Sequence, residues 1–386
     1  MIQTFTIHQG YTDALPADVD MDAERLNLLD RFYGDMIAQE KLQAASYLVA
    51  RRGKIVIHRS QGKLTPDKDG KDLMPDSVRK LYSITKIITA VAIVQLLEEG
   101  KLHIQQPVSS IIPEFDTSTH RSITIWHLLT HTSGLKPDSG VLFEPYERPH
   151  FEWWAREKEK HFGSSDKADR IKMILSGPLF CKPGEQWLYN TAGYAILGEI
   201  ISRVADMPYE EYIHKKITGP LGMERSFFRV PASLQDETCY TMDWERGQIY
   251  EPIEREHSLP QAGSGLYSTL NDLYRFGQAI LHGGTLNGTE ILGRRSVQMM
   301  LANQLHLVEN RCWGGDNKDM KMGLGWSMSR DDICTPGTAS HEGYGASGLF
   351  IDREEELLFA YFIPFVNDWI HDAVTNPRNM VWSSLL

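Results

Sequence analysis

A nearly continuous apolar run dominates the hydrophobic pattern of the chain; it covers Leu81–Leu102 and reads LYSITKIITAVAIVQLLEEGKL. Apolar side chains at positions 84, 87, 88 and 91 recur at helical spacing, and Gly100 stands where a helix would end. The run is too short to span a bilayer. It therefore predicts a helix buried in the core, with Lys86 as its one charged residue between Lys80 and Glu98.

The remaining pattern predicts strands at both ends of the chain and helices between them. Such an order favours an α/β (α+β) fold, with an antiparallel sheet built from both termini and flanked by helices. We expect residues 1–115 and 290–386 to form this sheet domain, residues 116–289 a mostly helical lobe, and the active site to lie in the cleft between them. The predicted helices are Met21–Leu42, Thr124–Leu129, Ala192–Val204, Met207–Leu221 and Ser268–Leu281, and the predicted strands are Ala45–Arg51, Lys54–Arg59, Gly325–Met328, Gly348–Ile351 and Leu357–Ile363.

One segment, Lys136–Asp169, shows no regular spacing of hydrophobic positions and is rich in aromatic and charged residues. It is either a lid or substrate-facing insertion, or a long surface connection. Trp153 and Trp154 within it, and Trp187 after it, either line an acyl pocket or serve packing.

Charge and cysteine usage narrow the function classes. The net charge of −11 and the lack of a basic run exclude a nucleic-acid binder of the usual kind. The N-terminus has neither a basic start nor an apolar core typical of a signal peptide. We expect a cytoplasmic protein without a membrane span, whose four cysteines are free thiols because they match no metal or redox spacing (Cys181, Cys239, Cys312 and Cys334).

Metal and cofactor chemistry is not predicted. His127 and His131 have the i, i+4 spacing of a zinc helix, but Leu128 stands where such a site needs glutamate. We expect no metal and no cofactor.

Lys86 points to nucleophilic catalysis, because a buried ammonium is costly and its pKa is driven down. Ser83 lies three residues earlier, on the same helix face, where a neutral amine could activate its hydroxyl. The Ser-x-x-Lys pattern alone does not identify a catalytic serine, because the chain contains five matches. Only the apolar setting distinguishes Ser83–Lys86 from the other four matches, which are Ser60–Lys63, Ser77–Lys80, Ser133–Lys136 and Ser164–Lys167.

Two later stretches fit the same chemistry. Tyr189 stands just before the predicted helix Ala192–Val204, and a tyrosine beside a lysine can serve as a general base. Ser340–Ser347 (SHEGYGAS) is rich in glycine, which permits close approach to the backbone, and a strand-edge N–H there could stabilise an oxyanion.

These three stretches, in this order, resemble the serine β-lactamase and penicillin-binding-protein superfamily, and most closely its class C β-lactamase-like branch of esterases and D-aminopeptidases. The resemblance implies a β-lactamase-like fold, Ser83 as the acylated serine, Lys86 as its partner and Tyr189 as the tyrosine of a Tyr-x-Asn element. It also implies that His341-Glu342-Gly343 stands where β-lactamases carry Lys-Thr-Gly, and that the N–H groups of Ser83 and Tyr344 form the oxyanion hole. Further matching stretches are WHLLTHTSGL (126–135), GPLGM (219–223), AGSGLYSTLNDLYRFGQAILHGG (262–284) and GLGW (323–326).

Two departures from that pattern bear on the substrate. Thr191 replaces the asparagine whose carboxamide orients the lysine, and Asn190, one residue earlier, directs its side chain elsewhere. His341 replaces a permanently charged lysine, which in β-lactamases attends the substrate carboxylate. We therefore expect a serine hydrolase acting on small-molecule esters or amides. The alternatives are a D-amino-acid peptidase, amidase or β-lactamase, an acyltransferase, and a non-catalytic binding protein; the oligomeric state is not predicted.

Overall fold

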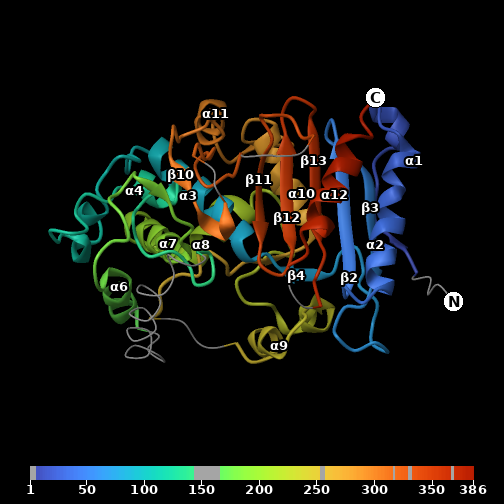
Figure 1. The fold of residues 1–386 in the computed structure, drawn as a ribbon, viewed down its shortest axis with the longest axis horizontal. Coiled ribbons are helices and arrows are strands. Elements are labelled where there is room, and N and C mark those ends of the chain that lie inside the picture. Colours follow the sequence, from blue (N-terminus) through green and yellow to red (C-terminus); the bar gives the residue numbers. More distant parts are fainter. Residues whose placement is uncertain (1–5, 143–165, 253–256, 316–317, 329–332, 367–368) are drawn as a thin grey trace.

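The computed structural model describes residues 6–142, 166–252, 257–315, 318–328, 333–366 and 369–386. Its central feature is a six-stranded sheet in which every neighbouring pair is antiparallel. Strands from the two ends of the chain meet where β2 pairs with β13, so the sheet is built from both termini as predicted (Figure 1). The strand order is β1 (His8–Gln9), β3 (Lys54–Gly62), β2 (Ala44–Arg51), β13 (Leu357–Phe362), β12 (Ser347–Asp352) and β11 (Ala339–Gly343).

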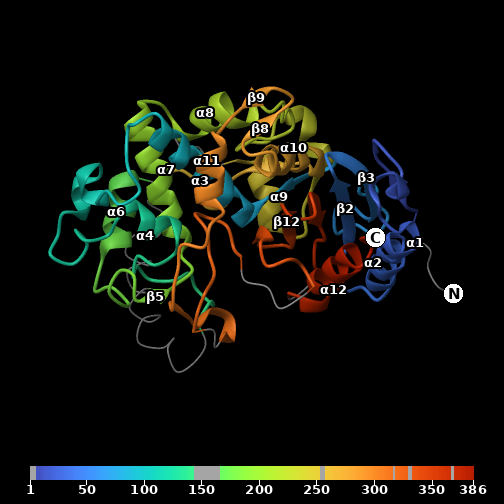
Figure 2. The ribbon, with the colours of Figure 1, turned by 90° about the horizontal axis from the view of Figure 1, so that it is seen from above.

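Helices cover both faces of this sheet, which explains why its strands are apolar on both sides. Leu48 and Ala360 pack into the cluster shared with α10 (Leu270–Leu281), whereas Val49 and Phe359 pack with the terminal helices. The terminal helices are α1 (Ala23–Leu26), α2 (Leu28–Ala38) and α12 (His371–Trp382), and they lie across the sheet from α10 (Figure 2).

The predicted core helix is α3 (Thr85–Glu98), preceded by a short 3-10 turn, η2 (Tyr82–Ile84). Every residue from Thr85 to Leu96 is buried, so this helix has no solvent face over that length. It packs against α7 (Thr191–Ala205), which in turn contacts α4 (Ile125–Leu129). The buried helix and the sheet edge at β11 together frame the predicted site, since β11 contacts η2.

Shorter elements complete the described structure. The helices are α6 (Lys167–Leu175), α8 (Tyr209–Ile213), α9 (Asp243–Tyr250) and α11 (Arg294–Met300), with a π-helical turn at His214–Thr218 and 3-10 turns at Pro16–Val19, Val108–Ser110, Pro113–Phe115, Ala232–Glu237 and Cys312–Gly314. The strands are β4 (Val78–Lys80), β5 (Gln186–Trp187), β6 (Thr238–Cys239), β7 (Tyr267–Ser268), β8 (Thr285–Leu286), β9 (Thr289–Glu290) and β10 (Glu309–Asn310).

Three predicted elements differ from the structure. The predicted helix Met21–Leu42 is two helices, α1 and α2, of which the second ends at Ala38. Gly325–Met328 is not a strand: Gly325 has φ +82°, and Ser327 makes only isolated bridges to Met322 and Ser340. The predicted helix Met207–Leu221 is broken, because α8 ends at Ile213 and passes into the π-helical turn. The strand β11 and the helices α9, α11 and α12 were not predicted.

Some predictions lie wholly or partly outside the described residues. The segment Lys136–Asp169 is described only at 136–142 and 166–169, so its role as a lid, and the roles of Trp153 and Trp154, stay predictions. The division into two domains with a cleft between them also stays a prediction. In the part of the chain that the structure describes, no helix combines the length and apolar character that crossing a membrane requires. All four cysteines are free, as expected.

Candidate active site

Ser83 lies in the η2 turn, between the short strand β4 and the buried helix α3. Two hydrogen bonds fix Leu81, the residue before this turn: Leu81 N–H donates to Leu266 O at 2.8 Å, and Ser347 Oγ donates to Leu81 O at 2.8 Å. Tyr82 has φ +49°, a left-handed conformation that bulky residues seldom adopt. The surrounding bonds therefore hold the serine on a strained turn at the start of a rigid helix.

Lys86 occupies the first turn of α3 and is fully buried. Its Nζ donates to three oxygens, at 3.1 Å to Ser83 Oγ, 3.0 Å to Thr191 Oγ1 and 2.9 Å to Gly263 O. Burial lowers the pKa of Lys86 from 10.5 to about 8, and the nearby Asp138 carboxylate partly opposes this shift. About a tenth of the lysine is therefore neutral at pH 7 and able to accept a proton.

Tyr189 precedes α7 and reaches the same serine oxygen as Lys86. Its hydroxyl donates to Ser83 Oγ at 2.6 Å, and its ring centre lies 4.8 Å from Lys86 Nζ. Burial raises the pKa of Tyr189 above its ordinary value, although the hydrogen bond to Ser83 works against this. The residue is thus a phenol in the resting site, and the three predicted groups form one hydrogen-bonded cluster.

Asn190 and Thr191 have different roles at the start of α7. The side-chain oxygen of Asn190 caps the helix by accepting from Gly193 N–H, and its amide donates to Lys136 O. The side chain of Asn190 is thus directed away from Lys86, as the one-residue shift indicated. Thr191 provides the contact to Lys86 that the resemblance assigned to a carboxamide.

The edge strand β11 forms the other side of the site. His341 lies on the same sheet face as Ala339, and its ring centre is 6.5 Å from that of Tyr189. Its Nδ1 is 2.8 Å from the Glu342 carbonyl, which can only accept, so Nδ1 carries a hydrogen. Glu342 points the other way, accepting from Tyr361 and approached by Arg378.

Gly343 allows β11 to approach the serine closely. A Cβ at this position would lie 2.3 Å from Leu81 O, 2.4 Å from Ser347 Oγ and 3.2 Å from Ser83 N. Tyr344 follows directly and begins the turn that leads to β12. The predicted oxyanion donors, the N–H groups of Ser83 and Tyr344, therefore come from two segments in contact.

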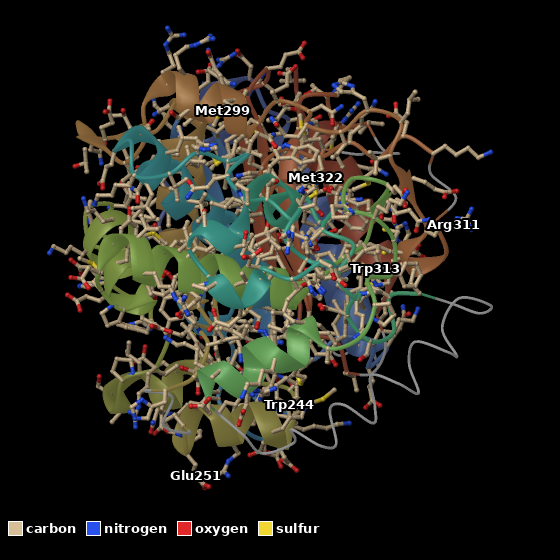
Figure 3. The ribbon with its side chains drawn as sticks, turned by 90° about the vertical axis from the view of Figure 1, so that its left-hand side faces the viewer. Trp244, Glu251, Met299, Arg311, Trp313 and Met322 are labelled. Atoms are coloured by element: carbon tan, nitrogen blue, oxygen red, sulfur yellow. The ribbon has the colours of Figure 1, made fainter. Side chains whose placement is uncertain are left out.

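Two residues near the site were not anticipated. Asp138 accepts from both the N–H and the hydroxyl of Thr191. Trp313 is 53% exposed, and its ring packs 5.0 Å from Tyr189 and 6.1 Å from Trp187. Figure 3 looks onto the side of the molecule where Trp313 lies near Met322. Pro137-Asp138-Ser139-Gly140 is a recognisable turn sequence, whereas nothing in the sequence marked Trp313.

A second aromatic group lies on the sheet side of the site. The rings of Tyr82 and Tyr344 are 5.4 Å apart, and Trp244 lies 6.4 Å from Tyr82 and 6.5 Å from Tyr344. Tyr344 and Trp244 are 62% and 44% exposed. Aromatic surface is thus available on both sides of Ser83.

The competing Ser-x-x-Lys pairs do not form comparable sites where both residues are described. Ser77 Oγ accepts from Met74 N–H at 3.0 Å, and Lys80 donates to Gln248. Ser60 Oγ donates to Leu73 O and Lys136 Nζ to Ser176 O. Ser164 lies outside the described residues. Among the described pairs, a serine–lysine hydrogen bond is found at Ser83–Lys86.

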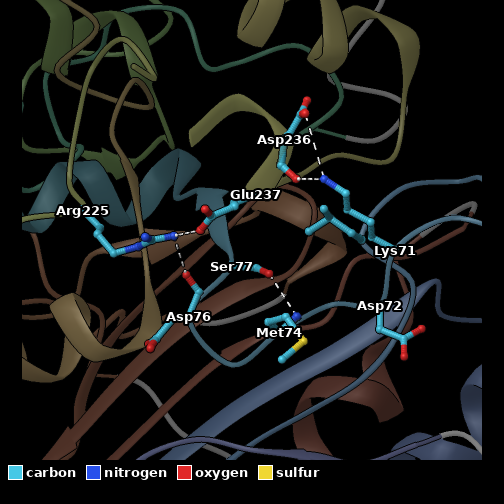
Figure 4. A pocket seen from close by; sticks show the side chains of 9 residues that line it. Lys71, Asp72, Met74, Asp76, Ser77, Arg225, Asp236 and Glu237 are labelled. Carbon is cyan, nitrogen blue, oxygen red and sulfur yellow. Dashed lines mark hydrogen bonds and ion pairs between the residues drawn. The ribbon is translucent and has the colours of Figure 1, made fainter. Parts of the chain in front are cut away.

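Ser77 also borders a pocket of about 420 Å³ that none of the predicted site residues lines. Arg225 donates to Glu237 at 2.7 Å and to Asp76 O at 3.1 Å (Figure 4), and Asp72 is held from outside the pocket by Lys63 and His8. The pocket therefore offers no activated nucleophile. Its lining comprises Leu64, Lys71, Asp72, Met74, Asp76, Ser77, Arg225, Asp236 and Glu237.

The two histidines of the discounted zinc spacing have local partners. His127 Nδ1 lies 3.1 Å from Thr124 N and 2.9 Å from its hydroxyl, which completes the N-cap of α4. His131 Nδ1 accepts from Asn190 N–H at 3.1 Å, so its ring helps to position the segment that carries Tyr189.

Comparisons with known proteins show the family and the fold. The family model described as Beta-lactamase matches residues 29–369. Protein Rv1367c of Mycobacterium tuberculosis (strain ATCC 25618 / H37Rv) is 30% identical over 340 residues, covering 79% of this chain and 81% of the relative. Esterase EstB of Burkholderia gladioli is 27% identical over 388 residues, covering 88% and 90%. The solved structure of EstCE1, described as a hydrolase with promiscuous acyltransferase activity, has the same fold, with a TM-score of 0.75, 18% identity, and coverage of 93% of this chain and 98% of that one.

Proposed function

Because the chain belongs to the β-lactamase family, we propose that it is a serine hydrolase that forms an acyl-enzyme on Ser83 and acts on small esters. The predicted family is thereby confirmed. The observation that carries the proposal is the cluster in which Lys86 Nζ and Tyr189 OH both reach Ser83 Oγ, at 3.1 and 2.6 Å. A serine contacted by a partly neutral lysine and a phenol is equipped for nucleophilic attack.

The proposed acylation begins with proton transfer from Ser83 to neutral Lys86, while Ser83 Oγ bonds to the ester carbonyl carbon. The N–H groups of Ser83 and Tyr344 stabilise the oxyanion that forms. As the intermediate collapses, the C–O bond to the leaving alkoxide breaks, and the alkoxide receives a proton from Tyr189. The Lys86 ammonium, whose Nζ lies 4.8 Å from the Tyr189 ring centre, then returns its proton to the Tyr189 phenolate, while Ser83 Oγ stays covalently bonded to the acyl group. Water then attacks the acyl carbon, and Tyr189, backed by neutral Lys86, accepts one proton from it. The bond between the acyl carbon and Ser83 Oγ breaks, that proton passes to Oγ, and the carboxylic acid leaves.

His341 supports a neutral ester as the substrate. His341 donates Nδ1–H to Glu342 O, and unlike the lysine of β-lactamases it has no permanent positive charge to offer a substrate carboxylate. A substrate that depends on carboxylate recognition, as a β-lactam does, is therefore disfavoured. The name of the relative esterase EstB is consistent with this choice.

Acyl transfer is a second candidate, favoured by the aromatic surface around Ser83 and by the description of EstCE1. Exposed Trp313, Tyr344 and Trp244 could bind an apolar alcohol that competes with water for the acyl-enzyme. The peptidase alternative is supported by relatives described as D-alanyl-D-alanine carboxypeptidases, 24–27% identical to this chain, but no residue contact described at the site favours a peptide over an ester.

The test is intact mass spectrometry after exposure to p-nitrophenyl butyrate, a fluorophosphonate and the β-lactam nitrocefin, with product formation followed in parallel. We expect hydrolysis of the ester, phosphonylation at Ser83 and little turnover of nitrocefin. Ser83→Ala should lose both hydrolysis and labelling, while Ser77→Ala, at a competing pair, should keep them. Labelling that persists in Ser83→Ala would refute the assignment, and efficient nitrocefin turnover would refute the substrate preference. Mass spectrometry of the product formed with an added alcohol distinguishes the two reactions, because acyl transfer gives a new ester and hydrolysis gives the free acid.

The proposed location is the cytoplasm. Four free cysteines, three of them buried, fit a reducing compartment.

A further inference from the structure

Asp138 is the one carboxylate held against the Ser83–Lys86–Tyr189 cluster among the described residues that contact it. Its backbone N–H donates to Tyr189 O at 2.9 Å, which fixes the loop beside the tyrosine. Its two carboxylate oxygens accept from Thr191, one from the backbone N–H at 2.8 Å and the other from the hydroxyl. The carboxylate is therefore held in one orientation, although it belongs to a loop.

The bonds between Asp138 and Thr191 determine which atom donates in the hydrogen bond between Thr191 and Lys86. A carboxylate can only accept, so the single hydroxyl hydrogen of Thr191 is committed to Asp138. The 3.0 Å contact between Thr191 Oγ1 and Lys86 Nζ must then use a hydrogen of the lysine. Gly263 O, a carbonyl 2.9 Å from Nζ, is likewise an acceptor.

Hydrogen counting then fixes the lone pair of Lys86. Its ammonium form has three hydrogens, one each for Thr191, Gly263 and Ser83. Its neutral form has two, and both are required by acceptors that cannot donate to it. The lone pair is left facing Ser83 Oγ, 3.1 Å away, which is the direction from which the serine proton must arrive.

We propose that Asp138 is a positioning residue that holds Thr191 as a hydrogen-bond acceptor and thereby aims the lone pair of Lys86 at Ser83. The proposal rests on the proposed function, because it assigns the lysine as the acceptor of the serine proton. Without Asp138, the Thr191 hydroxyl could donate to the amine and occupy the lone pair in place of Ser83. Asp138 and Thr191 together thus supply the orientation for which the resemblance would use a carboxamide.

The charge environment makes the role measurable. The titratable groups that face Lys86 in the described structure are Tyr189, Tyr194, His131 and Asp138. Burial raises the pKa of both tyrosines, and burial together with the nearby Lys86 lowers the pKa of His131, so these three are neutral. Asp138 is the charged member, and its carboxylate holds the pKa of Lys86 higher than burial alone would.

The experiment measures the second-order rate constant for fluorophosphonate labelling of Ser83 against pH, which requires no knowledge of the natural substrate. In Asp138→Asn, the carboxamide NH₂ must face either the N–H or the hydroxyl of Thr191, and one of these two contacts is lost or reversed. We expect the limiting rate at high pH to fall about tenfold, the size of a lost hydrogen bond to a charged group. We also expect the rising limb of the profile to move to lower pH, because the charge that raised the pKa of Lys86 is gone.

Variants at Thr191 separate positioning from general damage. Thr191→Val removes the acceptor and should lower the limiting rate by a similar factor of about ten. Thr191→Ser keeps the hydroxyl, so its limiting labelling rate should equal that of the wild type. The rising part of its pH–rate profile should stay at the wild-type pH. The double variant Asp138→Asn/Thr191→Val should be no slower than either single variant, because the two residues act as one unit. Ser139→Ala, an exposed neighbour in the same loop, is the matched control and should behave like the wild type.

The role of Asp138 would be overturned if Asp138→Asn kept both the wild-type limiting labelling rate and the wild-type pH profile. It would also be overturned if Thr191→Val were labelled as fast as Thr191→Ser. If Asp138→Asn does not fold by circular dichroism, the comparison of Thr191→Val with Thr191→Ser decides alone. Wild-type protein that is not labelled at Ser83 would refute the proposed function and this role with it. Labelled wild type with unaffected variants would refute only the role of Asp138.

Discussion

At the scale of single residues, the most informative feature is the burial of Lys86. The sequence predicted it because one lysine interrupts an otherwise apolar helix, and the structure places its Nζ within 3.1 Å of Ser83 Oγ. Asp138 could not be predicted in this way. It is 53 positions from Thr191 in sequence, and a lone aspartate in a turn has an ordinary local explanation. Only the tertiary structure gives it a partner.

The lowered pKa of Lys86 makes a stability prediction. Unfolded lysine has a pKa of 10.5, and the folded value is about 8, so between these pH values the unfolded chain binds a proton that the folded chain does not. The free energy of unfolding of the wild type should therefore rise by about 2–3 kcal/mol between pH 8 and 10.5, relative to Lys86→Met. The sign follows because stability increases with pH wherever the unfolded state holds more protons.

Denaturant unfolding of the two proteins across this pH range measures the difference. Lys54→Met, at an exposed lysine, is the control and should follow the wild-type pH dependence. Parallel curves for wild type and Lys86→Met would mean that the lysine is not desolvated as the structure has it. Lys86→Met should also abolish fluorophosphonate labelling.

At the scale of elements, the sequence predicted helices and strands with a clear hydrophobic periodicity. It missed elements such as β11 that depend on tertiary pairing. The hairpin β2–β3 was predicted from apolar runs on either side of Arg52-Gly53, whose φ values are +49° and +73°. The strand β11 has few β-branched residues, and its pairing with β12 and contact with η2 make it a strand. Gly325–Met328 has strand-like residues but no continuous partner.

The close contact of β11 with η2 predicts a specific effect of Gly343→Ala. The new Cβ would lie 2.3 Å from Leu81 O and 2.4 Å from Ser347 Oγ, so β11 or η2 must shift. Such a shift separates the two proposed oxyanion donors, and the rate of ester hydrolysis should fall at least about 100-fold. The free energy of unfolding should fall by about 1–3 kcal/mol, as is usual for overpacking.

Gly337→Ala is the matched control, because a Cβ there meets no atom within 4 Å and the substitution lies just before the same strand. It should leave both the hydrolysis rate and the stability near the wild-type values. Full activity in Gly343→Ala would show that the oxyanion is not bound between β11 and η2.

At the scale of the whole molecule, the arrangement of the termini was predictable and the connections around the site were not. Apolar strands at both ends can be buried on both faces only if they share one sheet, which the β2–β13 pairing provides. The sequence could not reveal how segments far apart meet beneath Ser83, because charged residues such as Arg79 and Glu245 are normally assigned to the surface. Both are buried here.

Arg79 joins three distant parts of the chain beneath the nucleophile turn. Its guanidinium lies 3.6 Å from Glu245 in α9, and it donates to Gly345 O at 3.2 Å, in the turn after β11, and to Cys239 O at 3.3 Å in β6. Glu245 also accepts from Tyr82, the residue before Ser83. The ion pair therefore connects the oxyanion turn, the nucleophile turn and the 238–250 segment.

Removing the charge of Glu245 should destabilise the protein strongly, because Arg79 would remain buried without its counter-charge. For Glu245→Gln we expect the free energy of unfolding at pH 7 to fall by about 3–5 kcal/mol.

Burial by itself would raise the pKa of Glu245, but Arg79 and hydrogen bonds from Tyr82 and Thr241 hold it below its usual value. A carboxylate with a lowered pKa contributes its stability above the unfolded value of 4.5 and loses it as the pH falls through the folded value. The difference between wild type and Glu245→Gln should therefore shrink below about pH 4.5, whereas Glu237→Gln, an exposed pair with Arg225, should cost about 1 kcal/mol or less. Urea unfolding of the three proteins at pH 7 and pH 4 measures these differences, and a Glu245→Gln variant as stable as Glu237→Gln would show that the ion pair does not hold the site together.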